Sequence, residues 1–399
     1  MRIAMIGQKG MPAIYGGVEQ HVHELSTRLV KVGHDVTVYS RPWYAKHNEN
    51  FIEGVRIQAL PSIRTKHLDT ITHVLLSSLH ALKERYDIIH YHGVGPALLS
   101  WIPRIFSPKS TVIASFHSID RYHQKWGAFA RFWLRLGERA ACFFAHKTIT
   151  VSRSLQQYCL NEFNKQTAYI PNAVSEETQK LDPSLVNAFG LESKNYIVMI
   201  SRLVPHKRAH LLIQAFNDLK REKIDDSENV NYKLKIKNLK LAIVGGSVYT
   251  DDYIRSLHRL AADRNDIVFT DFQSGETLQA LYQHACVLVH PSVNEGLPIT
   301  VMQSMASKTP VLLSNIPEHI ELIQDSDCVF RGNDVDALKE SLSRFFSLSE
   351  GELHKTVEKN LHTIQTAYSW ETVLADIETL YHNQKKSKHK RPRPVEASV

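Results

Sequence analysis

The stretch MRIAMIGQKGMPAIYGGVE, residues 1–19, joins a short apolar run to a loop that ends in a glycine pair. Residues 2–6 predict a buried strand, because the run is short and glycine follows it. A helix is predicted behind Gly17, since apolar side chains recur there at helical spacing, at Val18, Val22, Leu25 and Leu29. Bare backbone at the start of a helix would let a phosphate or a sugar approach free N–H groups. A tight turn without a ligand is the alternative on these residues alone.

The alternation of strand and helix continues through the first half of the chain. Helices are predicted over residues 68–84 and 127–145. Further strands are predicted at residues 36–39, 87–90 and 111–114. This alternation is typical of a parallel sheet with helices on both faces.

The pattern restarts after residues 168–183, a stretch with several acidic residues that we interpret as a domain boundary. Strands then follow at residues 196–201, 241–245, 267–270, 287–290 and 311–314. The predicted fold class is therefore α/β, with two Rossmann-like parallel-sheet domains that face each other across a cleft. Ligands of such sheets bind beyond the carboxyl ends of the strands, so we expect chemistry in the loops that follow strands.

We expect an N-terminal domain over residues 1–180 and a C-terminal domain over residues 181–366. A helix over residues 367–384 and a basic, disordered tail over residues 385–399 would follow. The polar segment 220–240 interrupts a connection that should need only a few residues, and we interpret it as a surface insertion without an assigned function.

The net charge of +7 in this 399-residue chain is concentrated near its end. Six basic residues lie there without an acidic one: Lys385, Lys386, Lys388, Lys390, Arg391 and Arg393. The rest of the chain is almost neutral, which argues against nucleic-acid binding, since such proteins carry basic surface on their folded domains. The tail could hold the protein at an anionic membrane, with a solubilising end as the alternative.

The cysteines and the hydropathy pattern predict a cytoplasmic protein. Four cysteines lie far apart without a C-x-x-C pair, which favours buried thiols in a reducing compartment over disulfides or a metal site. The N-terminal apolar run is too short for a secretion signal, and no apolar stretch approaches the length that spans a bilayer.

The glycine loop does not fit dinucleotide binding. In the G-x-G-x-x-G register that starts at Gly7, Lys9 and Pro12 occupy glycine positions. The second strand ends in Ser40-Arg41 rather than in an acid that would bind a ribose. These departures argue against an NAD-dependent dehydrogenase.

Three loops that follow predicted strands carry residues suited to chemistry. His117 could orient a hydroxyl or assist a proton transfer. Arg202 and Lys207 share one loop, and two permanent cations suit an anionic leaving group such as a nucleoside diphosphate. Glu295 precedes Gly296 and a predicted helix, whose first amides could hold a phosphate. The alternatives on these residues alone are a surface or core histidine and solvated surface charge.

Six motifs occur in a characteristic order and spacing: GGVE from Gly16, SFH ending in His117, IPNAV from Ile170, SRLVPHK ending in Lys207, LAIVGG ending in Gly246 and HPSVNEGLPITVMQSMA ending in Ala306. Together they resemble the family-4 retaining glycosyltransferases, which have the GT-B fold. The match extends from residue 1 to about 382, and its start resembles bacterial polysaccharide glycosyltransferases, which often use lipid-linked acceptors. In this fold the C-terminal helix, here starting near Trp370, crosses back to the first domain.

The resemblance implies a role for each matched residue. Arg202 and Lys207 would bind the donor diphosphate and stabilise the charge that builds on it. Glu295 would contact hydroxyls of the donor sugar, and His117 would contact the sugar or the acceptor. The implied donor-binding positions are Gly16, Gly17, Gly246, Phe272, Gln273, Gly296, Leu297 and Gln303. No metal ion and no other cofactor is implied, because the two cations do what a divalent ion would do.

Metal-binding motifs are weak. The D-x-D sequence at residues 325–327 precedes a late strand, outside the context that a metal-dependent transferase needs. The H-x-H pairs, His21 with His23 and His90 with His92, lack the third and fourth ligands of a site.

One position departs from the family pattern. The family has a second glutamate eight residues after the first, and this chain has Gln303 there. That glutamate grips the ribose hydroxyls through two carboxylate oxygens, whereas glutamine offers one acceptor oxygen. The change should cost roughly 1–2 kcal/mol, or about tenfold in donor affinity.

The predicted function is retaining transfer of a sugar from a UDP- or GDP-linked donor to an acceptor hydroxyl. The acceptor would be a lipid-linked or growing glycan of a cell-surface polysaccharide, and the enzyme would be cytoplasmic or peripheral at the inner face of the plasma membrane. Two alternatives stay open. One is a non-catalytic nucleotide-sugar-binding protein of the same fold, which Gln303 would suit. The other is a nucleotide-sugar epimerase, which would form product without an acceptor.

Overall fold

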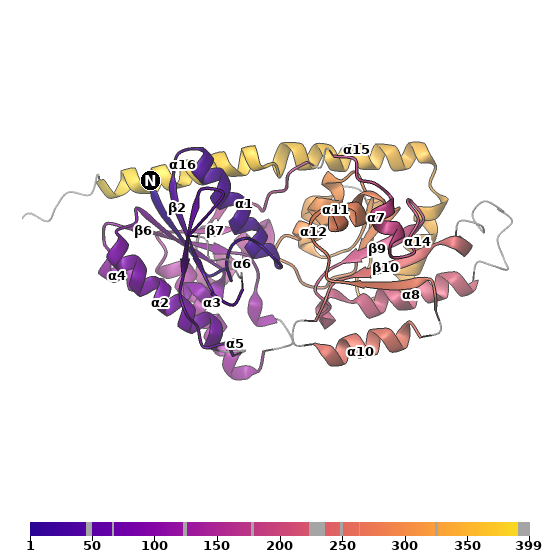
Figure 1. Cartoon of the computed structure of the whole chain (residues 1–399), viewed down its shortest axis with the longest axis horizontal. Coiled ribbons are helices and arrows are strands. Elements are labelled where there is room, and N and C mark those ends of the chain that lie inside the picture. The colour runs from indigo at the N-terminus through magenta and orange to yellow at the C-terminus, as the bar shows by residue number, and fades with distance from the viewer. Residues whose placement is uncertain are drawn as a thin grey trace, which may run out of the picture. The chain divides into compact units, whose positions relative to one another are not determined.

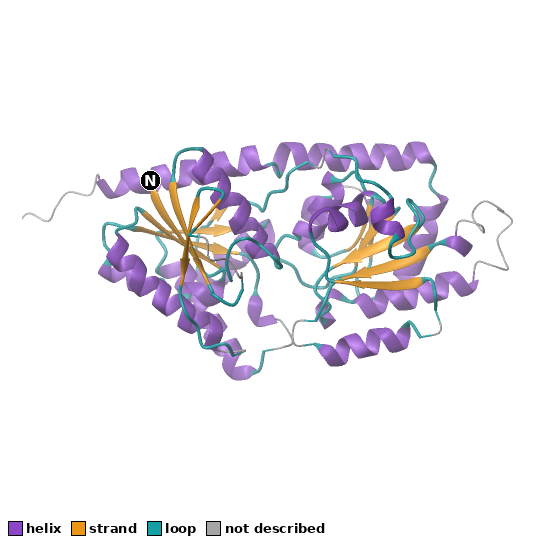
Figure 2. Cartoon of the chain, viewed as in Figure 1, coloured by secondary structure: helices purple, strands orange, loops and turns teal. Residues whose placement is uncertain are grey.

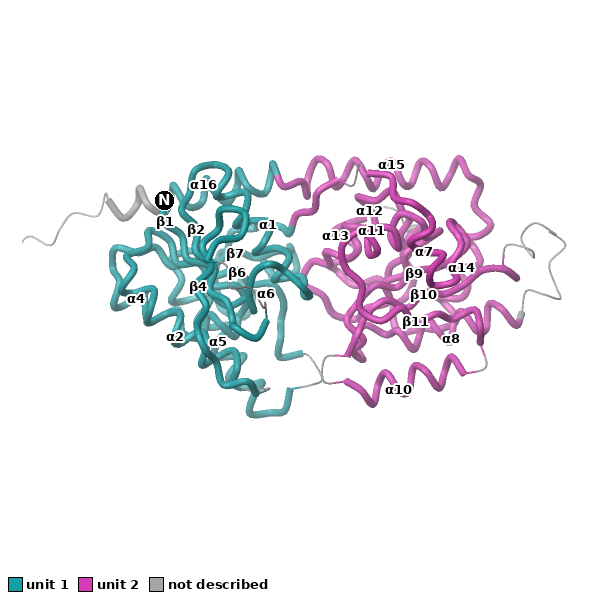
Figure 3. The backbone as a smooth tube through the Cα atoms, viewed as in Figure 1, with its two compact units in different colours: residues 1–172, 371–399 teal, residues 173–370 magenta. Residues whose placement is uncertain are grey.

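The computed structural model describes residues 1–44, 50–65, 68–122, 126–176, 179–222, 236–247, 250–262, 264–323 and 326–389. Two compact units, coloured separately in Figure 3, make up the chain, and each has its own sheet (Figure 2). Unit 1 comprises Met1–Asn172 and Glu371–Val399, and unit 2 comprises Ala173–Trp370. The polypeptide therefore leaves unit 1 once and returns to it with its last helix.

The sheet of unit 1 has eight strands in the order β3-β4-β2-β1-β5-β6-β7-β8. Their bounds are Arg2–Ile6 for β1, Asp35–Ser40 for β2, Phe51–Ile52 for β3, Val55–Ala59 for β4, Ile88–His92 for β5, Thr111–Phe116 for β6, Lys147–Thr150 for β7 and Ala168–Tyr169 for β8. Every pair is parallel except β3 with β4. The central strands β5 and β6 are buried along their whole length, as strands covered on both faces must be.

Helices cover both faces of this sheet. They are α1 Gly17–Lys31, α2 Leu68–Glu84, α3 Val94–Ala97, α4 Trp101–Phe106, the 3₁₀ turn η1 Asp120–Tyr122, α5 Ala128–Phe143 and α6 Arg153–Phe163. The connection from β1 to β2 through α1 runs toward the β3 edge of the sheet. The connections through α2 to α5 run toward the β8 edge. Because such crossovers are right-handed, α2 to α5 cover one face and α1 covers the opposite face (Figure 1).

Helix α16, Trp370–His389, returns the chain to unit 1. The hydroxyl of its fully buried Tyr381 lies 2.8 Å from Nδ1 of His90 on β5. Near the end of α1, Nε2 of His34 lies 3.1 Å from Oε1 of Glu378. These two contacts fix the last helix to the sheet and to the turn between α1 and β2.

Unit 2 is built on a six-stranded parallel sheet in the order β11-β10-β9-β12-β13-β14. The strands are β9 Tyr196–Ile200, β10 Lys240–Val244, β11 Ile267–Asp271, β12 Val287–His290, β13 Val311–Ser314 and β14 Val329–Phe330. The helices and 3₁₀ turns are α7 Ser184–Asn187, η2 Pro205–Lys207, α8 Ala209–Glu222, α10 Asp251–Leu260, α11 Gly275–Gln283, α12 Ile299–Ala306, α13 Pro317–Leu322, η3 Ser326–Cys328, α14 Val335–Ser347 and α15 Glu350–Ala367. The core packs aliphatic residues of the central strands against α8 and α14, with Ile197, Phe216 and Leu342 fully buried.

The α/β class with two Rossmann-like parallel sheets is confirmed. The expected boundary at residues 180–181 lies instead at Asn172–Ala173. The reason is that Val174 already pairs with unit 2, where its N–H donates to the carbonyl of Tyr368 at 3.1 Å and it forms a β-bridge to Ser369.

The expected helix over residues 367–384 and the tail after it also differ. Helix α16 begins at Trp370 and continues to His389, so Lys385, Lys386 and Lys388 are part of a helix. No glycine or proline interrupts the sequence before Pro392, so nothing ends the helix at residue 384. Lys390, Arg391 and Arg393 lie outside the described residues, as do residues 223–235 of the expected insertion and Asp325 of the D-x-D sequence.

Two further features of the described residues concern the cysteines and the hydropathy of the helices. None of the four cysteines, all of them described, forms a disulfide, and three are buried. Within the described part of the chain, no helix combines the length and the apolar character needed to cross a bilayer.

Candidate functional site

An ion pair joins two loops at the carboxyl ends of the unit 2 strands. Lys207, at the end of η2 after β9, contacts Oε1 of Glu295, in the loop between β12 and α12, through its Nζ atom. The loops are held together by the backbone, since the N–H of Val293 donates to the carbonyl of His206 at 3.0 Å. Both charged side chains are about nine-tenths buried. The structure therefore brings together two of the residues expected to act on a substrate.

Glu295 has a second partner on the preceding strand. Nε2 of His290 lies 2.8 Å from the same Oε1 atom. A carboxylate oxygen only accepts, so His290 carries its proton on Nε2. Burial alone would raise the pKa of Glu295, but Lys207 and His290 outweigh it and hold this pKa well below its usual range. Burial lowers the pKa of Lys207, and the attraction of Glu295 opposes that shift.

His319 on α13 completes the surroundings of His290. The two rings meet edge to face with centroids 5.3 Å apart. Nδ1 of His319 lies 2.8 Å from the carbonyl oxygen of Ser314. In the sequence, His290 is the last residue of the predicted strand 287–290, and no motif marks His319. The imidazoles of His290 and His319 thus lie close to the carboxylate of Glu295, although the three residues come from different elements.

Other expected residues line the same end of the sheet. Arg202, in the loop after β9, is exposed, and its charge acts on Lys207. The carbonyl of Gly246 accepts from the N–H of Leu203 at 3.1 Å, which ties the loop after β10 to that of Arg202. A Cβ on Gly246 would lie 4.0 Å from Cβ of Phe272, so the two residues are neighbours. The side chain of Phe272 is 47% exposed and is available for stacking with a planar ring.

Gln273 and Gln303 are both held by local hydrogen bonds. Nε2 of Gln273 donates to the carbonyl of Thr270. Oε1 of Gln303, on α12, accepts from the hydroxyl of Tyr282 at 3.0 Å. The single acceptor oxygen of Gln303 is therefore engaged inside the protein. Gly296 and Leu297 are buried in the loop between Glu295 and α12.

The glycine pair of unit 1 begins α1. Gly16 has φ of 107°, and a Cβ there would lie 2.0 Å from Oε2 of Glu19. The other oxygen of this buried carboxylate accepts from the N–H of Lys9 at 3.2 Å. The absence of a side chain at Gly16 is thus required by the loop itself. Gly17 is exposed at the first turn of α1.

His117 lies in a cluster of buried histidines at the carboxyl ends of β5 and β6. Its Nε2 is 3.2 Å from Nδ1 of His92, and the two rings are stacked. His21, on α1, approaches His117 with ring centroids 5.3 Å apart. Burial is the main cause that lowers the pKa of each of these histidines, to about 4 for His21, so all three are neutral at pH 7.

Two groups among the described residues have ligand atoms close enough for one metal ion: His21, His92 and His117 in unit 1, and His290, Glu295 and His319 in unit 2. In the second group the ammonium of Lys207 already neutralises Glu295, which disfavours a further cation. In the first group two of the nitrogens can bond to each other directly. Each H-x-H pair, judged weak from the sequence, contributes one histidine to the unit 1 group. His23 instead contacts Oε1 of Glu53 at 3.0 Å, and His90 contacts the hydroxyls of Tyr381 and Ser115.

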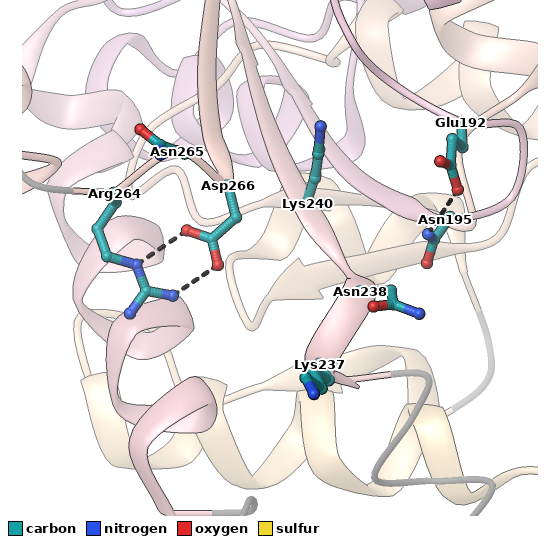
Figure 4. A pocket seen from close by; sticks show the side chains of 8 residues that line it. All are labelled: Glu192, Asn195, Lys237, Asn238, Lys240, Arg264, Asn265 and Asp266. Carbon is teal, nitrogen blue, oxygen red and sulfur yellow. Dashed lines mark hydrogen bonds and ion pairs between the residues drawn. The ribbon is translucent and has the colours of Figure 1, made fainter.

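A hollow of about 710 Å³ lies at the other end of the unit 2 sheet (Figure 4). Its lining includes Asn195, Lys240 and Asp266, which stand at or just before the starts of β9, β10 and β11. Arg264 donates to Asp266 at 2.8 and 2.7 Å within it. Ligands of parallel α/β sheets bind at the carboxyl ends of strands, so this hollow is separate from the residues described above.

Two family models match the chain, one over each half. The model described as Glycosyltransferase Family 4 matches residues 15–178, and the model described as Glycosyl transferases group 1 matches residues 185–370. The chain is a family-4 glycosyltransferase of the GT-B fold. The resemblance stated from the motifs is therefore confirmed for the family and for the fold.

Relatives and solved structures agree with this assignment. The glycosyltransferase is 25% identical to an uncharacterized glycosyltransferase of Methanocaldococcus jannaschii, over 96% of this chain and 98% of the relative. It is 27% identical to the GDP-mannose-dependent alpha-(1-6)-phosphatidylinositol monomannoside mannosyltransferase of Mycolicibacterium smegmatis, over 82% and 85%. The crystal structure of Anabaena HepE in complex with UDP and glucose superposes with a TM-score of 0.76 at 16% identity, covering 96% of this chain and all of that one.

Proposed function

We propose that this glycosyltransferase transfers a sugar from a nucleoside diphosphate to an acceptor hydroxyl with retention of configuration, and that the loops of Lys207 and Glu295 bind the donor. The observation that carries the proposal is the buried contact between these two side chains. It holds a cation suited to a diphosphate beside a carboxylate suited to sugar hydroxyls. Arg202 adds a second cation, and the exposed ring of Phe272 offers a surface on which a base can stack.

The proposed reaction exchanges one bond at the anomeric carbon. The bond from this carbon to the diphosphate oxygen breaks, and the acceptor oxygen bonds to the carbon on the same face. The acceptor proton passes to the leaving phosphate. Arg202 and Lys207 stabilise the negative charge that grows on the diphosphate, and loss of one such group typically costs on the order of 10²–10³ in rate. The proposed contact of His117 is with the sugar or the acceptor.

The donor is proposed to be UDP- or GDP-linked and the acceptor to be a lipid-linked or growing glycan. Support for the donor comes from the GDP-mannose-dependent relative and from the UDP bound in the HepE structure. Support for the acceptor comes from a relative described as an O-antigen chain mannosyltransferase, 26% identical over 61% of this chain.

A panel of UDP- and GDP-sugars, each incubated with and without polyprenyl-diphosphate-linked acceptors, tests the proposal. Mass spectrometry should detect a product one sugar heavier with one donor, and NMR should show that the anomeric configuration of the donor is kept. Inverted configuration would contradict the same-face reaction. Donor binding without transfer or hydrolysis across the panel would favour a non-catalytic binder, and an altered donor formed without acceptor would favour an epimerase.

A further inference from the structure

Unit 1 exposes large apolar side chains on two of its helices, α4 and α5, and we call these side chains together the apolar face. It consists of Trp101, Ile105 and Phe106 on α4 and Phe129, Phe132 and Trp133 on α5. Phe129 is 77% exposed and Phe106 is 65% exposed. In the described part of unit 2, by contrast, the exposed large apolar side chains are Phe272, Val293 and Ile320, on separate elements. Clusters of exposed large apolar side chains mark interaction sites on proteins that otherwise meet water.

Helices α4 and α5 lie on the same face of the sheet. Both belong to connections that cross the sheet in the same direction, and Figure 1 shows them with α2 and α3 on the face opposite α1. Helix α2 packs against α3 and α4, and α3 packs against α5. Helix α2 also exposes Leu76 and Leu79.

The charges beside the apolar face are basic. Arg131 and Arg139 on α5 and Lys109 after α4 are exposed, and Arg104 on α4 is half-exposed. Over the described residues from 94 to 146, the acidic side chains are Asp120 and Glu138.

One of these two acids is already paired inside the protein. Glu138 is fully buried and accepts from Arg121 at 3.0 Å, Arg135 at 3.2 Å and Tyr158 at 2.7 Å. Asp120 accepts from the hydroxyl of Ser118 at 2.6 Å. The segment that carries both parts of the apolar face therefore has more exposed cations than exposed acids.

We propose that the apolar face docks unit 1 on an anionic lipid bilayer. Aromatic and aliphatic side chains with arginines beside them suit the boundary between headgroups and acyl chains, where rings lie in the apolar layer and guanidinium groups meet phosphates. A symmetric contact between two copies of this face would bring the same cations together, which is unfavourable. The proposal concerns where the enzyme lies and does not depend on the donor chemistry.

Sedimentation with vesicles tests this proposal on the full chain. Vesicles of equal parts phosphatidylglycerol and phosphatidylcholine are compared with pure phosphatidylcholine. The wild type should bind the anionic vesicles, and the triple variant F129S/F132S/W133S should bind them at least about tenfold less, since three exposed rings are lost. The variant R131Q/R139Q should also bind at least about tenfold less, and high salt should weaken binding of the wild type.

Control variants separate the apolar face from other causes. V32S/F51S removes two exposed apolar side chains of unit 1 outside α2 to α5 and should bind as the wild type does. Nucleotide binding and transfer to a soluble acceptor should survive in every variant, which shows that each is folded. Unchanged vesicle binding by the triple variant would overturn the proposal. Loss of all binding on deletion of residues 390–399, with the triple variant unaffected, would assign the contact to the tail instead. The wild type could instead form a dimer, fail to bind vesicles, and lose the dimer only in the triple variant. That result would assign the apolar face to contact with a second copy of the chain.

Discussion

At the scale of single residues, Glu295 owes its position to partners from separate parts of unit 2. Lys207 follows β9, and His290 ends β12. The motifs predicted the lysine and the carboxylate, because each stands in a loop after a strand. They did not predict the role of His290, since a histidine at the end of a buried strand has no sequence signal that distinguishes a partner of a carboxylate from a core side chain.

Gln303 gives the first prediction. Its one acceptor oxygen is taken by the hydroxyl of Tyr282. In Gln303→Glu one carboxylate oxygen can keep that bond, and the second becomes available to ribose hydroxyls. Nucleotide affinity should rise about tenfold, measured by calorimetric titration of the donor nucleotide. Weaker binding would show that Gln303 does not face the ribose.

Metal removal gives the second prediction. Lys207 and Arg202 supply the positive charge that a divalent ion would otherwise provide, so transfer should be unchanged after dialysis against a chelator. The readout is the rate of product formation before and after dialysis. Activity that is lost and then restored by zinc would instead assign an ion to His21, His92 and His117, whose nitrogens are close enough to share one.

At the scale of elements, strands made mostly of buried apolar residues were predictable, whereas a strand of mixed polarity near the sheet edge was not. Residues 2–6 and 287–290 match β1 and β12, because apolar side chains dominate each stretch and a loop follows it. The strand β4, Val55–Ala59, was missed because the sequence VRIQA mixes polar and apolar residues next to the sheet edge. The expected end of α16 at residue 384 is wrong, because a run of basic residues without glycine or proline can continue a helix.

The anchoring of α16 gives the third prediction. Tyr381→Phe removes the hydroxyl that meets Nδ1 of His90 and leaves that nitrogen buried without its partner. The free energy of unfolding should fall by about 1–3 kcal/mol. Chemical denaturation measures it, with Tyr122→Phe as the control because Tyr122 is 52% exposed. Equal stability of the two variants would show that the buried hydrogen bond does not hold the helix.

At the scale of the whole molecule, the motifs identified the family and the fold, whereas the domain boundary required contacts. No motif or periodicity around Val174 indicates which unit this segment belongs to. It belongs to unit 2 because it pairs with Ser369, almost two hundred residues later. Pairings of that kind depend on the folded chain, and periodicity in a short window does not contain them.

Buried histidines give the fourth prediction. Burial is the largest cause that lowers the pKa of His90 and His319 to about 3 and of His21 to about 4. The unfolded chain has ordinary histidine pKa values and binds more protons between about pH 4 and 6.5, so stability must fall as pH falls through this range. Each histidine contributes a slope of up to about 1.4 kcal/mol per pH unit.

Denaturation at pH 7.5, 6 and 5 measures this slope. His90→Gln should reduce it, and His354→Gln should not, because His354 is exposed. Stability that stays constant or rises between pH 7.5 and 5 would contradict neutral burial of these imidazoles.

The central claim is that Lys207 binds the diphosphate of the donor, and calorimetric titration with UDP and GDP tests it most directly. The matched control is Lys220, which is also buried and paired, with Asp266 at 3.1 Å in the same unit. We expect Lys207→Ala to weaken binding of the preferred nucleotide about tenfold or more and Lys220→Ala to leave its affinity unchanged. Equal affinity of the wild type and Lys207→Ala would contradict the account.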